Sequence, residues 1–131
     1  MDGSEYGGVV NIRKLMQGLS YSGEAEGKRQ SYYVFEGSEF FLVLSFSHTK
    51  PSAGNFNIVE SDAADYVFQR FAGVKGVTTN DVVEKGRRSR HIPTTLAALN
   101  IMYVLAATGR ASIDTRRVGP KLFFNVKRKH A

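Results

Sequence analysis

Cationic side chains gather at three places in the second half of the chain, and the chemistry they offer is the binding of anions. They lie in GRRSRHIP, in RASIDTRRVGPK and in the tail VKRKH. Residues 1–65 hold five Lys/Arg and nine Asp/Glu, whereas residues 66–131 hold thirteen and three, which gives net charges of −4 and +10. Because guanidinium and ammonium groups donate charge-assisted hydrogen bonds to phosphate, this asymmetry indicates a nucleic-acid partner. A basic surface without a partner is the alternative.

The acidic residues of the first half include one triplet of the kind found in metal-dependent nucleases. Glu24, Glu26 and Lys28 lie within GEAEGK, and such enzymes use carboxylates and an E-x-K unit to hold Mg²⁺ and position water. The segment is predicted to be a loop, however, and no well-placed aspartate precedes it. Asp62 and Asp65 are expected to stabilise a helix N-terminus rather than to bind metal. A small metal-dependent nuclease is therefore the enzymatic alternative.

The other residues that carry chemistry favour a protein without a catalytic site. His48, His91 and His130 have no partner at metal-ligand spacing, and the chain has no cysteine. Neither glycine-rich nucleotide-binding motif is present. We therefore predict no catalytic residue, no metal ligand and no cofactor.

The first sixty residues are predicted to form a β-rich unit. SYYVF at 31–35 and EFFLVLSFS at 39–47 flank a short glycine-containing turn, a pattern typical of a hairpin. NFNIV at 55–59 alternates and predicts a third strand. The first half of 39–47 is apolar on both faces, so this strand is expected to be central. SYSGEAEGKRQ at 20–30 is expected to be a loop.

The second half is predicted to hold three helices and a hairpin. Apolar residues recur at helical spacing after Ser61, the expected N-cap, and end before Gly73, the expected C′ residue. Thr79 is the expected cap of a short helix, and Val77 is an expected short strand before it. The predicted elements are helices 61–72, 79–85 and 94–107 and strands 110–114 and 121–126.

This order of elements resembles the winged-helix variant of the helix-turn-helix. The resemblance is carried by TTNDVVEK, by the helix ending in LAATG, and by RASIDTRRVGPKLFFNV. It covers residues 61–126 and implies an α+β fold. An N-terminal antiparallel β-hairpin or sheet, subdomain 1–60, is joined to a C-terminal winged helix-turn-helix, subdomain 61–131, in one compact unit.

The resemblance implies that the chain binds double-stranded DNA. The second helix of a helix-turn-helix places its N-terminal residues in the major groove, and the wing reaches phosphates or the minor groove. Cations near a helix start or in a tail add phosphate contacts. The residues expected to contact DNA are Thr94, Thr95 and Ala98 at the helix start, Arg87, Arg88, Arg90 and His91 before it, Arg110, Arg116, Arg117 and Lys121 in the hairpin, and Lys127, Arg128 and Lys129 in the tail.

The helix at 94–107 departs from this family in its composition. A groove-reading helix needs a polar outer face, but within 96–107 the only polar groups are Asn100 and the Tyr103 hydroxyl. Either its first turn alone reaches DNA, or it packs on both sides, against the N-terminal sheet or a second copy. We expect a core helix, with a homodimer through helix 94–107 as the alternative. The DNA contact is therefore expected at the wing and the arginine-rich turn more than at the helix.

The sequence thus predicts a cytoplasmic, non-catalytic DNA-binding protein, either a transcription regulator or the DNA-recognition subunit of a larger complex. No run approaches the roughly 18 apolar residues of a membrane span. The N-terminus lacks the charged-then-apolar order of a signal peptide. A nuclease and a dimeric protein-interaction module remain as alternative functions.

Overall fold

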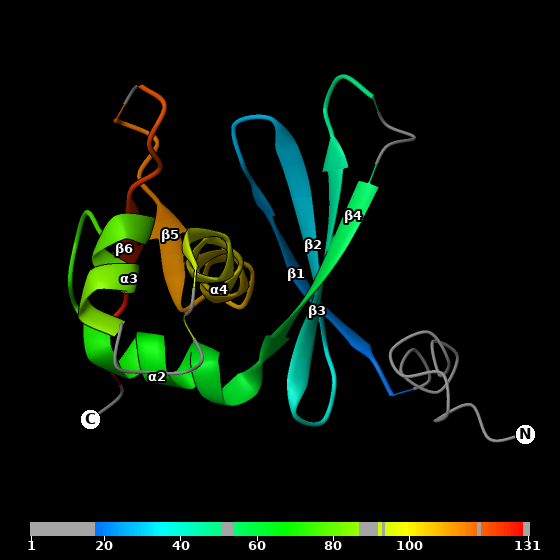
Figure 1. Ribbon diagram of the computed structural model, residues 1–131, viewed down its shortest axis with the longest axis horizontal. Coiled ribbons are helices and arrows are strands. Elements are labelled where there is room, and N and C mark those ends of the chain that lie inside the picture. Colours follow the sequence, from blue (N-terminus) through cyan, green and yellow to red (C-terminus); the bar gives the residue numbers. More distant parts are fainter. Residues whose placement is uncertain (1–17, 51–53, 87–91, 93, 118, 130–131) are drawn as a thin grey trace, which may run out of the picture.

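The structure is a computed structural model, and it describes residues 18–50, 54–86, 92, 94–117 and 119–129. Within this part of the chain, a four-stranded antiparallel sheet is followed by three helices and a two-stranded ribbon (Figure 1). The predicted α+β class is confirmed at this level. The elements are β1 (Ser20–Glu26), β2 (Gln30–Glu36), β3 (Phe40–Ser47), β4 (Gly54–Glu60), α2 (Ser61–Phe71), α3 (Thr79–Gly86), α4 (Thr95–Ala107), β5 (Ala111–Ile113) and β6 (Phe124–Val126).

The four-stranded sheet is a meander in which each strand pairs with the next one along the chain. Successive side chains point to opposite faces of a sheet, so each strand supplies one inner row and one outer row. On the inner face Val34 lies opposite Val43, Phe41 lies opposite Val59, and all four are buried. The predicted hairpin and third strand are confirmed, and β3 is a central strand as expected.

The expectation of a loop at residues 20–30 is wrong, because residues 20–26 form the edge strand β1. Ala25 is buried on the inner face, while Glu24 is exposed. The register shifts between Tyr21 and Gly23, and Gly23 has a φ of 145°. A bulge of this kind interrupts the alternation of side chains, and glycine lowers strand propensity, so the strand pattern is hidden in the sequence.

The three predicted helices are confirmed, but in two of them the N-cap position lies one residue before the expected one. Ser61 is the first residue of α2, and Glu60 takes the N-cap position without a side-chain cap bond. Helix α3 begins at Thr79. The Thr78 hydroxyl accepts the Asp81 N–H at 3.2 Å, and the Asp81 carboxylate accepts the Thr78 N–H at 3.0 Å. This reciprocal pair caps α3.

The segment after α2 runs antiparallel to β6. Gly73 has a φ of 80°, as expected for a C′ residue, and its N–H donates to the Lys127 carbonyl at 3.0 Å. Val77 exchanges two backbone hydrogen bonds of 2.8 Å with Phe124. The expected short strand at Val77 is therefore present as a bridge, and it extends the β5–β6 ribbon on the β6 side.

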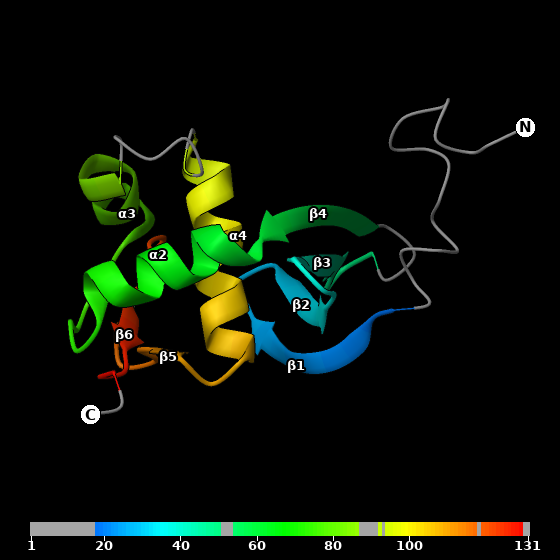
Figure 2. The same cartoon turned by 90° about the horizontal axis from the view of Figure 1, so that it is seen from below.

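Helix α4 lies between the four-stranded sheet and the remainder of the C-terminal half (Figures 1 and 2). Ile101, Met102 and Leu105 are almost completely buried. On the sheet side, the Tyr103 ring stacks on Tyr32 with the ring centroids 3.7 Å apart. The helix is apolar all round because it packs on both sides within one chain. Buried residues of both halves form one core around it.

The burial of α4 between the sheet and the other helices concerns two predictions: a homodimer through this helix and the absence of a membrane span. Most of its apolar surface is buried inside one chain, and Leu96, 59% exposed, is the one large apolar side chain of α4 that is exposed among the described residues, so a homodimer through helix 94–107 remains a prediction. Although α4 is apolar, no helix in the described part of the chain is long and apolar enough to cross a membrane.

Candidate nucleic-acid interface

One buried carboxylate organises the β5–β6 turn, which we define as residues 114–123. The side chain of Asp114 is 5% exposed and accepts hydrogen bonds from Nε and Nη2 of Arg116 at 3.0 and 3.1 Å. Its Oδ1 also accepts the backbone N–H of Arg116 at 3.1 Å. The Nε of Arg117 lies 3.6 Å from the Oδ2 of Asp114. The same anion therefore orients two arginines.

The electrostatics of this turn leave a net positive charge facing solvent. Hydrogen bonds from the side chain and backbone of Arg116 lower the pKa of Asp114 from 3.8 to about 2. The pKa of Arg116 is raised by the same pair. The side chain of Arg116 is 83% exposed, and the guanidinium of Arg117 lies 4.3 Å from the Phe123 ring centroid. Two fixed guanidinium groups and one carboxylate are thus presented together at neutral pH.

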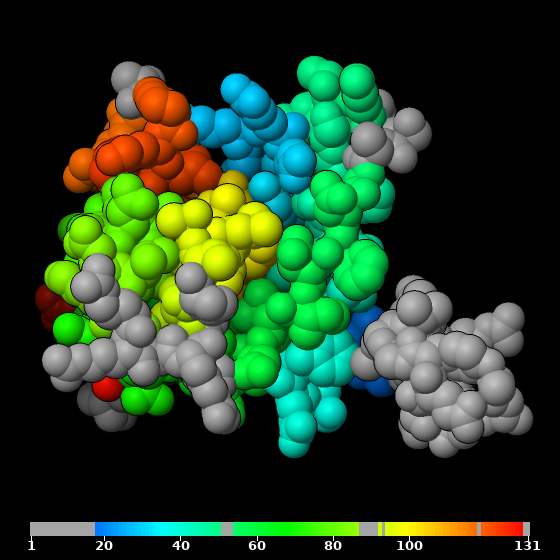
Figure 3. Space-filling model, viewed as in Figure 1, coloured from blue at the N-terminus to red at the C-terminus, as the bar shows by residue number. Residues whose placement is uncertain are grey.

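The β1–β2 turn lies beside the β5–β6 turn, although the two are far apart in sequence. The Nζ of Lys28 donates a hydrogen bond to the carbonyl of Gly119, 91 residues further along the chain. Figures 1 and 3 show both turns at one end of the molecule. We name the exposed cations of these two turns the basic rim: Lys28, Arg29, Arg116, Arg117 and Lys121.

Lys28 and Arg29 are members of this surface that the sequence did not predict. The first half of the chain is net acidic, and residues 20–30 were expected to be a loop. The available signal was an adjacent Lys-Arg pair between two strands, which becomes visible once β1 is recognised. The Lys28-Arg29 pair lies near the β5–β6 turn because of tertiary packing, which a local sequence pattern does not predict.

The first turn of α4 is exposed between the β5–β6 turn and β4, near the centre of the face in Figure 3. Thr94 and Thr95 are exposed there, as the predicted contact requires. The Thr94 hydroxyl accepts the Ala97 N–H at 3.0 Å and so acts as the N-cap of α4. The expectation that Ala98 approaches DNA is wrong, because this residue is fully buried in the core.

Among the described residues, the other predicted cations, Arg110 and those of the tail, are not brought to the basic rim. Arg110 donates from Nη1 to Asp65 at 2.8 Å, and its guanidinium lies 5.2 Å from the Phe68 ring centroid, so its charge is largely used within the fold. The tail continues from β6 at the end of the ribbon opposite the β5–β6 turn (Figure 1). The exposed tail cations are Lys127, Arg128 and Lys129. The predicted contacts Arg87, Arg88, Arg90 and His91 lie outside the described residues.

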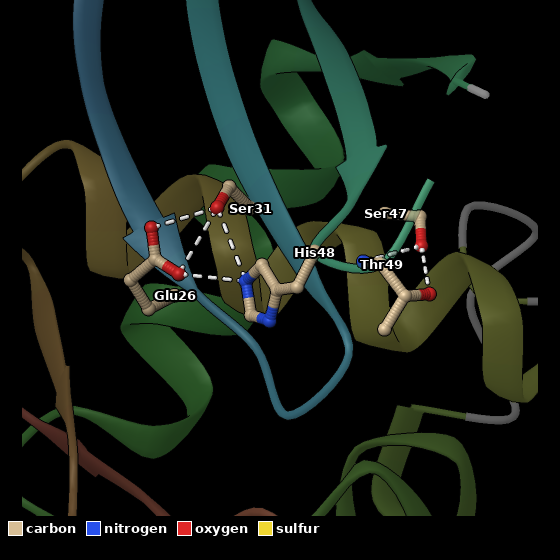
Figure 4. Close-up of polar contacts among 5 residues, drawn as sticks. All are labelled: Glu26, Ser31, Ser47, His48 and Thr49. Carbon is tan, nitrogen blue, oxygen red and sulfur yellow. Dashed lines mark hydrogen bonds and ion pairs between the residues drawn. The ribbon is translucent and has the colours of Figure 1, made fainter. Parts of the chain in front are cut away.

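A histidine, a serine and a glutamate meet where the β1–β2 hairpin and the end of β3 lie side by side (Figure 4). The Nε2 of His48 lies 2.9 Å from Glu26 and 3.2 Å from the Ser31 hydroxyl, which in turn donates to Glu26 at 2.8 Å. In a hydrolytic triad the histidine joins the acid and the serine through two different ring nitrogens. Here both partners share one nitrogen, so the cluster fits a structural link between the strands and not a nucleophilic site.

The carboxylates proposed as metal ligands are dispersed in the structure. Glu24 accepts a hydrogen bond from the Tyr21 hydroxyl at 3.3 Å, and Glu26 belongs to the cluster with His48. Asp62 lies in the first turn of α2. Among the residues that the structure describes, no three His, Asp or Glu side chains are placed to hold a metal ion. The nuclease alternative therefore gains no supporting geometry from this part of the chain.

Comparison of the chain with protein-family models, with curated proteins and with solved structures found no match.

Proposed function

We propose that this chain is a non-catalytic protein that binds duplex DNA through the basic rim. It would act as a transcription regulator or as the DNA-recognition subunit of a larger complex. The order of α2, α3, α4 and the β5–β6 ribbon, with Val77 beside β6, resembles a winged helix-turn-helix. In that comparison the β5–β6 turn corresponds to the wing.

The observation that carries the proposal is the gathering of five cations from two distant turns at one end of the molecule. Among the described ion pairs, those involving rim residues go to a single carboxylate, Asp114. Like charges held close together repel one another unless an anion lies between them. A phosphate backbone supplies a row of such anions, and Arg116 and Arg117 are already oriented to meet it.

The position of α4 determines what kind of DNA contact the proposal allows. The sheet covers one side of this helix and α2, α3 and the ribbon cover the other, so only its first turn is open to solvent. A helix buried in this way cannot lie along the major groove. We therefore propose binding dominated by phosphate contacts, with Thr94 and Thr95 as the helix residues nearest to DNA.

The test is a binding titration of a fluorescent duplex at about 50 and about 200 mM salt. The wild-type protein should bind at low salt and lose affinity steeply at high salt. Arg116→Ala/Arg117→Ala should weaken binding to every duplex and reduce the log–log salt slope by about 1.8, which is 0.9 for each lost phosphate contact. Because Asp114 loses both arginine partners in the double variant, circular dichroism should be used to check that this variant still folds. Absence of duplex binding by the wild type at low salt would contradict the proposal.

A further inference from the structure

A cleft separates the first half of α4 from the edge strand β4, on the face shown in Figure 3. It consists of two adjoining hollows of about 430 and 440 Å³, which share Asn57, Leu96 and Asn100. Volumes of this size are typical of small-molecule sites. The opposite end of α4 has no such space, because a Cβ on Gly23 of β1 would lie 2.1 Å from the Ala107 carbonyl oxygen.

The inner face of the sheet changes from apolar to polar as it approaches this cleft. Along the β3–β4 pair, Val43 lies opposite Asn57 and Ser45 lies opposite Asn55. Ser45 and, from the facing helix, Asn100 are each only 4% exposed. Placing uncharged polar side chains at core positions is unfavourable unless they find hydrogen-bond partners. The hydrogen-bond partners of Ser45 and Asn100 therefore indicate whether these polar side chains only stabilise the fold or are also available to a ligand.

The polar groups of the cleft have unused hydrogen-bonding capacity. The Nδ2 of Asn100 donates to the Leu96 carbonyl of its own helix at 3.0 Å, and no hydrogen bond to its Oδ1 is found among the described residues. Because no fully buried side-chain oxygen or nitrogen in this part of the chain lacks a partner, the Oδ1 is accessible from the cleft that Asn100 lines. The hydroxyl of Ser45 reaches the Asn55 carbonyl only at 3.5 Å. Within the same part of the chain, the side-chain amides of Asn55 and Asn57 make no hydrogen bond. These groups are accessible to water, which a ligand can replace, so the cleft can hydrogen-bond an external partner.

The lining restricts the chemistry of that partner. The hollow next to β2 is lined by amides, a hydroxyl and the apolar or aromatic surfaces of Tyr32, Phe56, Leu96 and Leu99. Among the described residues no charged side chain lines this hollow, while Glu60 lines the adjoining one. Amides both donate and accept hydrogen bonds, and aromatic and aliphatic walls favour flat apolar faces. No described cation lines either hollow. The cleft therefore suits a neutral planar ring with a mixed donor and acceptor edge, which is the chemistry of a nucleobase.

The cleft also adjoins the surface proposed to hold phosphates. Gln30 lines the hollow next to β2, and its neighbour in the chain, Arg29, belongs to the basic rim. Thr94, at the exposed start of α4, lines the other hollow. A nucleic acid with phosphates on the rim would thus have a base within reach of the cleft.

We propose that the cleft receives an unpaired nucleobase of the DNA bound on the basic rim. This inference rests on the proposed DNA binding. It adds a selectivity for unpaired bases, which α4 does not supply because most of the helix is buried. Bases that are already unpaired cost least to move out of a duplex stack, so a bulged or mismatched base is the expected occupant. Hydrogen bonds from Asn57 and Asn100 would read its edge.

Three duplex probes of equal length test the proposal: one fully paired, one with an extra unpaired adenine, and one with an abasic sugar in place of that adenine. The wild type should bind the adenine probe about tenfold more tightly than the abasic probe. Asn100→Leu and Asn57→Ala should both lose this preference and keep wild-type affinity for the paired duplex. Asn57 is half-buried on an edge strand, so its variant remains informative if Asn100→Leu fails to fold. Gln69→Ala, at an exposed position of α2 outside the cleft, is the control and should keep the preference.

The outcomes separate the two proposals. Equal binding of the adenine and abasic probes, or a preference that survives in both cleft variants, would overturn the cleft proposal while duplex binding stands. A cleft-dependent adenine preference without binding of the paired duplex would overturn the duplex proposal and keep the cleft as a nucleobase site. Failure of all three probes to bind at low salt would overturn both.

Discussion

Asp114 orients the arginines of the β5–β6 turn and removes one positive charge from the basic rim. Its carboxylate is nearly buried, yet it holds Arg116 through two side-chain nitrogens and the backbone N–H. Side chains that are ordered before binding lose less conformational entropy when a ligand arrives. We expect this orientation to favour phosphate binding more than the lost charge weakens it.

The lowered pKa of Asp114 predicts a specific acid sensitivity. Because the pKa is about 2 in the folded protein and near 3.8 when unperturbed, the unfolded chain takes up the proton first as the pH falls. The stability contributed by the ionised carboxylate is therefore complete above about pH 4 and is lost between about pH 4 and pH 2. Urea unfolding across this range should show a loss of stability in the wild type that is smaller in Asp114→Asn. Identical pH profiles for the two proteins would rule out this role of Asp114.

At the level of elements, the contact between β1 and the end of α4 fixes the sheet on the helix. Gly23 sits at the β1 bulge with a φ of 145°, and a Cβ there would clash with the backbone of Ala107. Gly23→Ala should lower the free energy of unfolding by about 1–3 kcal/mol, because both the backbone strain and the close approach are unfavourable. Gly18→Ala is the control, since a Cβ at Gly18 meets nothing within 4 Å. Denaturant titration measures both, and equal stability of the two variants would contradict this packing.

The elements differ in how well their sequences predict them. Helical spacing of apolar residues and the glycine at 73 identified α2, and the apolar character of α4 correctly indicated packing on both sides. Strand β1 was missed because its bulge breaks the alternation. Contacts between elements follow from tertiary packing, which local sequence patterns do not predict. The pairing of Arg110 with Asp65, 45 residues apart, is one such contact, and it engages a residue predicted to contact DNA within the fold.

For the molecule as a whole, the four-stranded sheet determines how α4 can be used. It covers the helix that the winged-helix resemblance would place in the major groove, and it forms one wall of the cleft. The same sheet brings Lys28 and Arg29 to the β5–β6 turn. The N-terminal half therefore contributes residues to the proposed DNA-binding surface, although its net charge is negative.

This arrangement predicts weak discrimination between fully paired duplexes. With the body of α4 buried, binding should depend on phosphates, so unrelated duplexes should compete within about tenfold of one another, against roughly 10³-fold or more for a sequence-specific protein. Competition titrations with duplexes of equal length and different sequence measure the ratio. A preferred sequence bound about 1000-fold more tightly would show that α4 reads bases after all.

The central claim is that the basic rim, and not positive charge in general, binds duplex DNA. Its most direct test is the salt dependence of duplex affinity in two variants that each remove two positive charges. Lys28→Ala/Arg29→Ala changes the rim, while Lys127→Ala/Arg128→Ala changes the exposed tail at the other end of the ribbon. We predict that the rim variant loses affinity and about 1.8 of the log–log salt slope, and that the tail variant keeps the wild-type slope. Equal losses in both variants, or no loss in the rim variant, would contradict the claim.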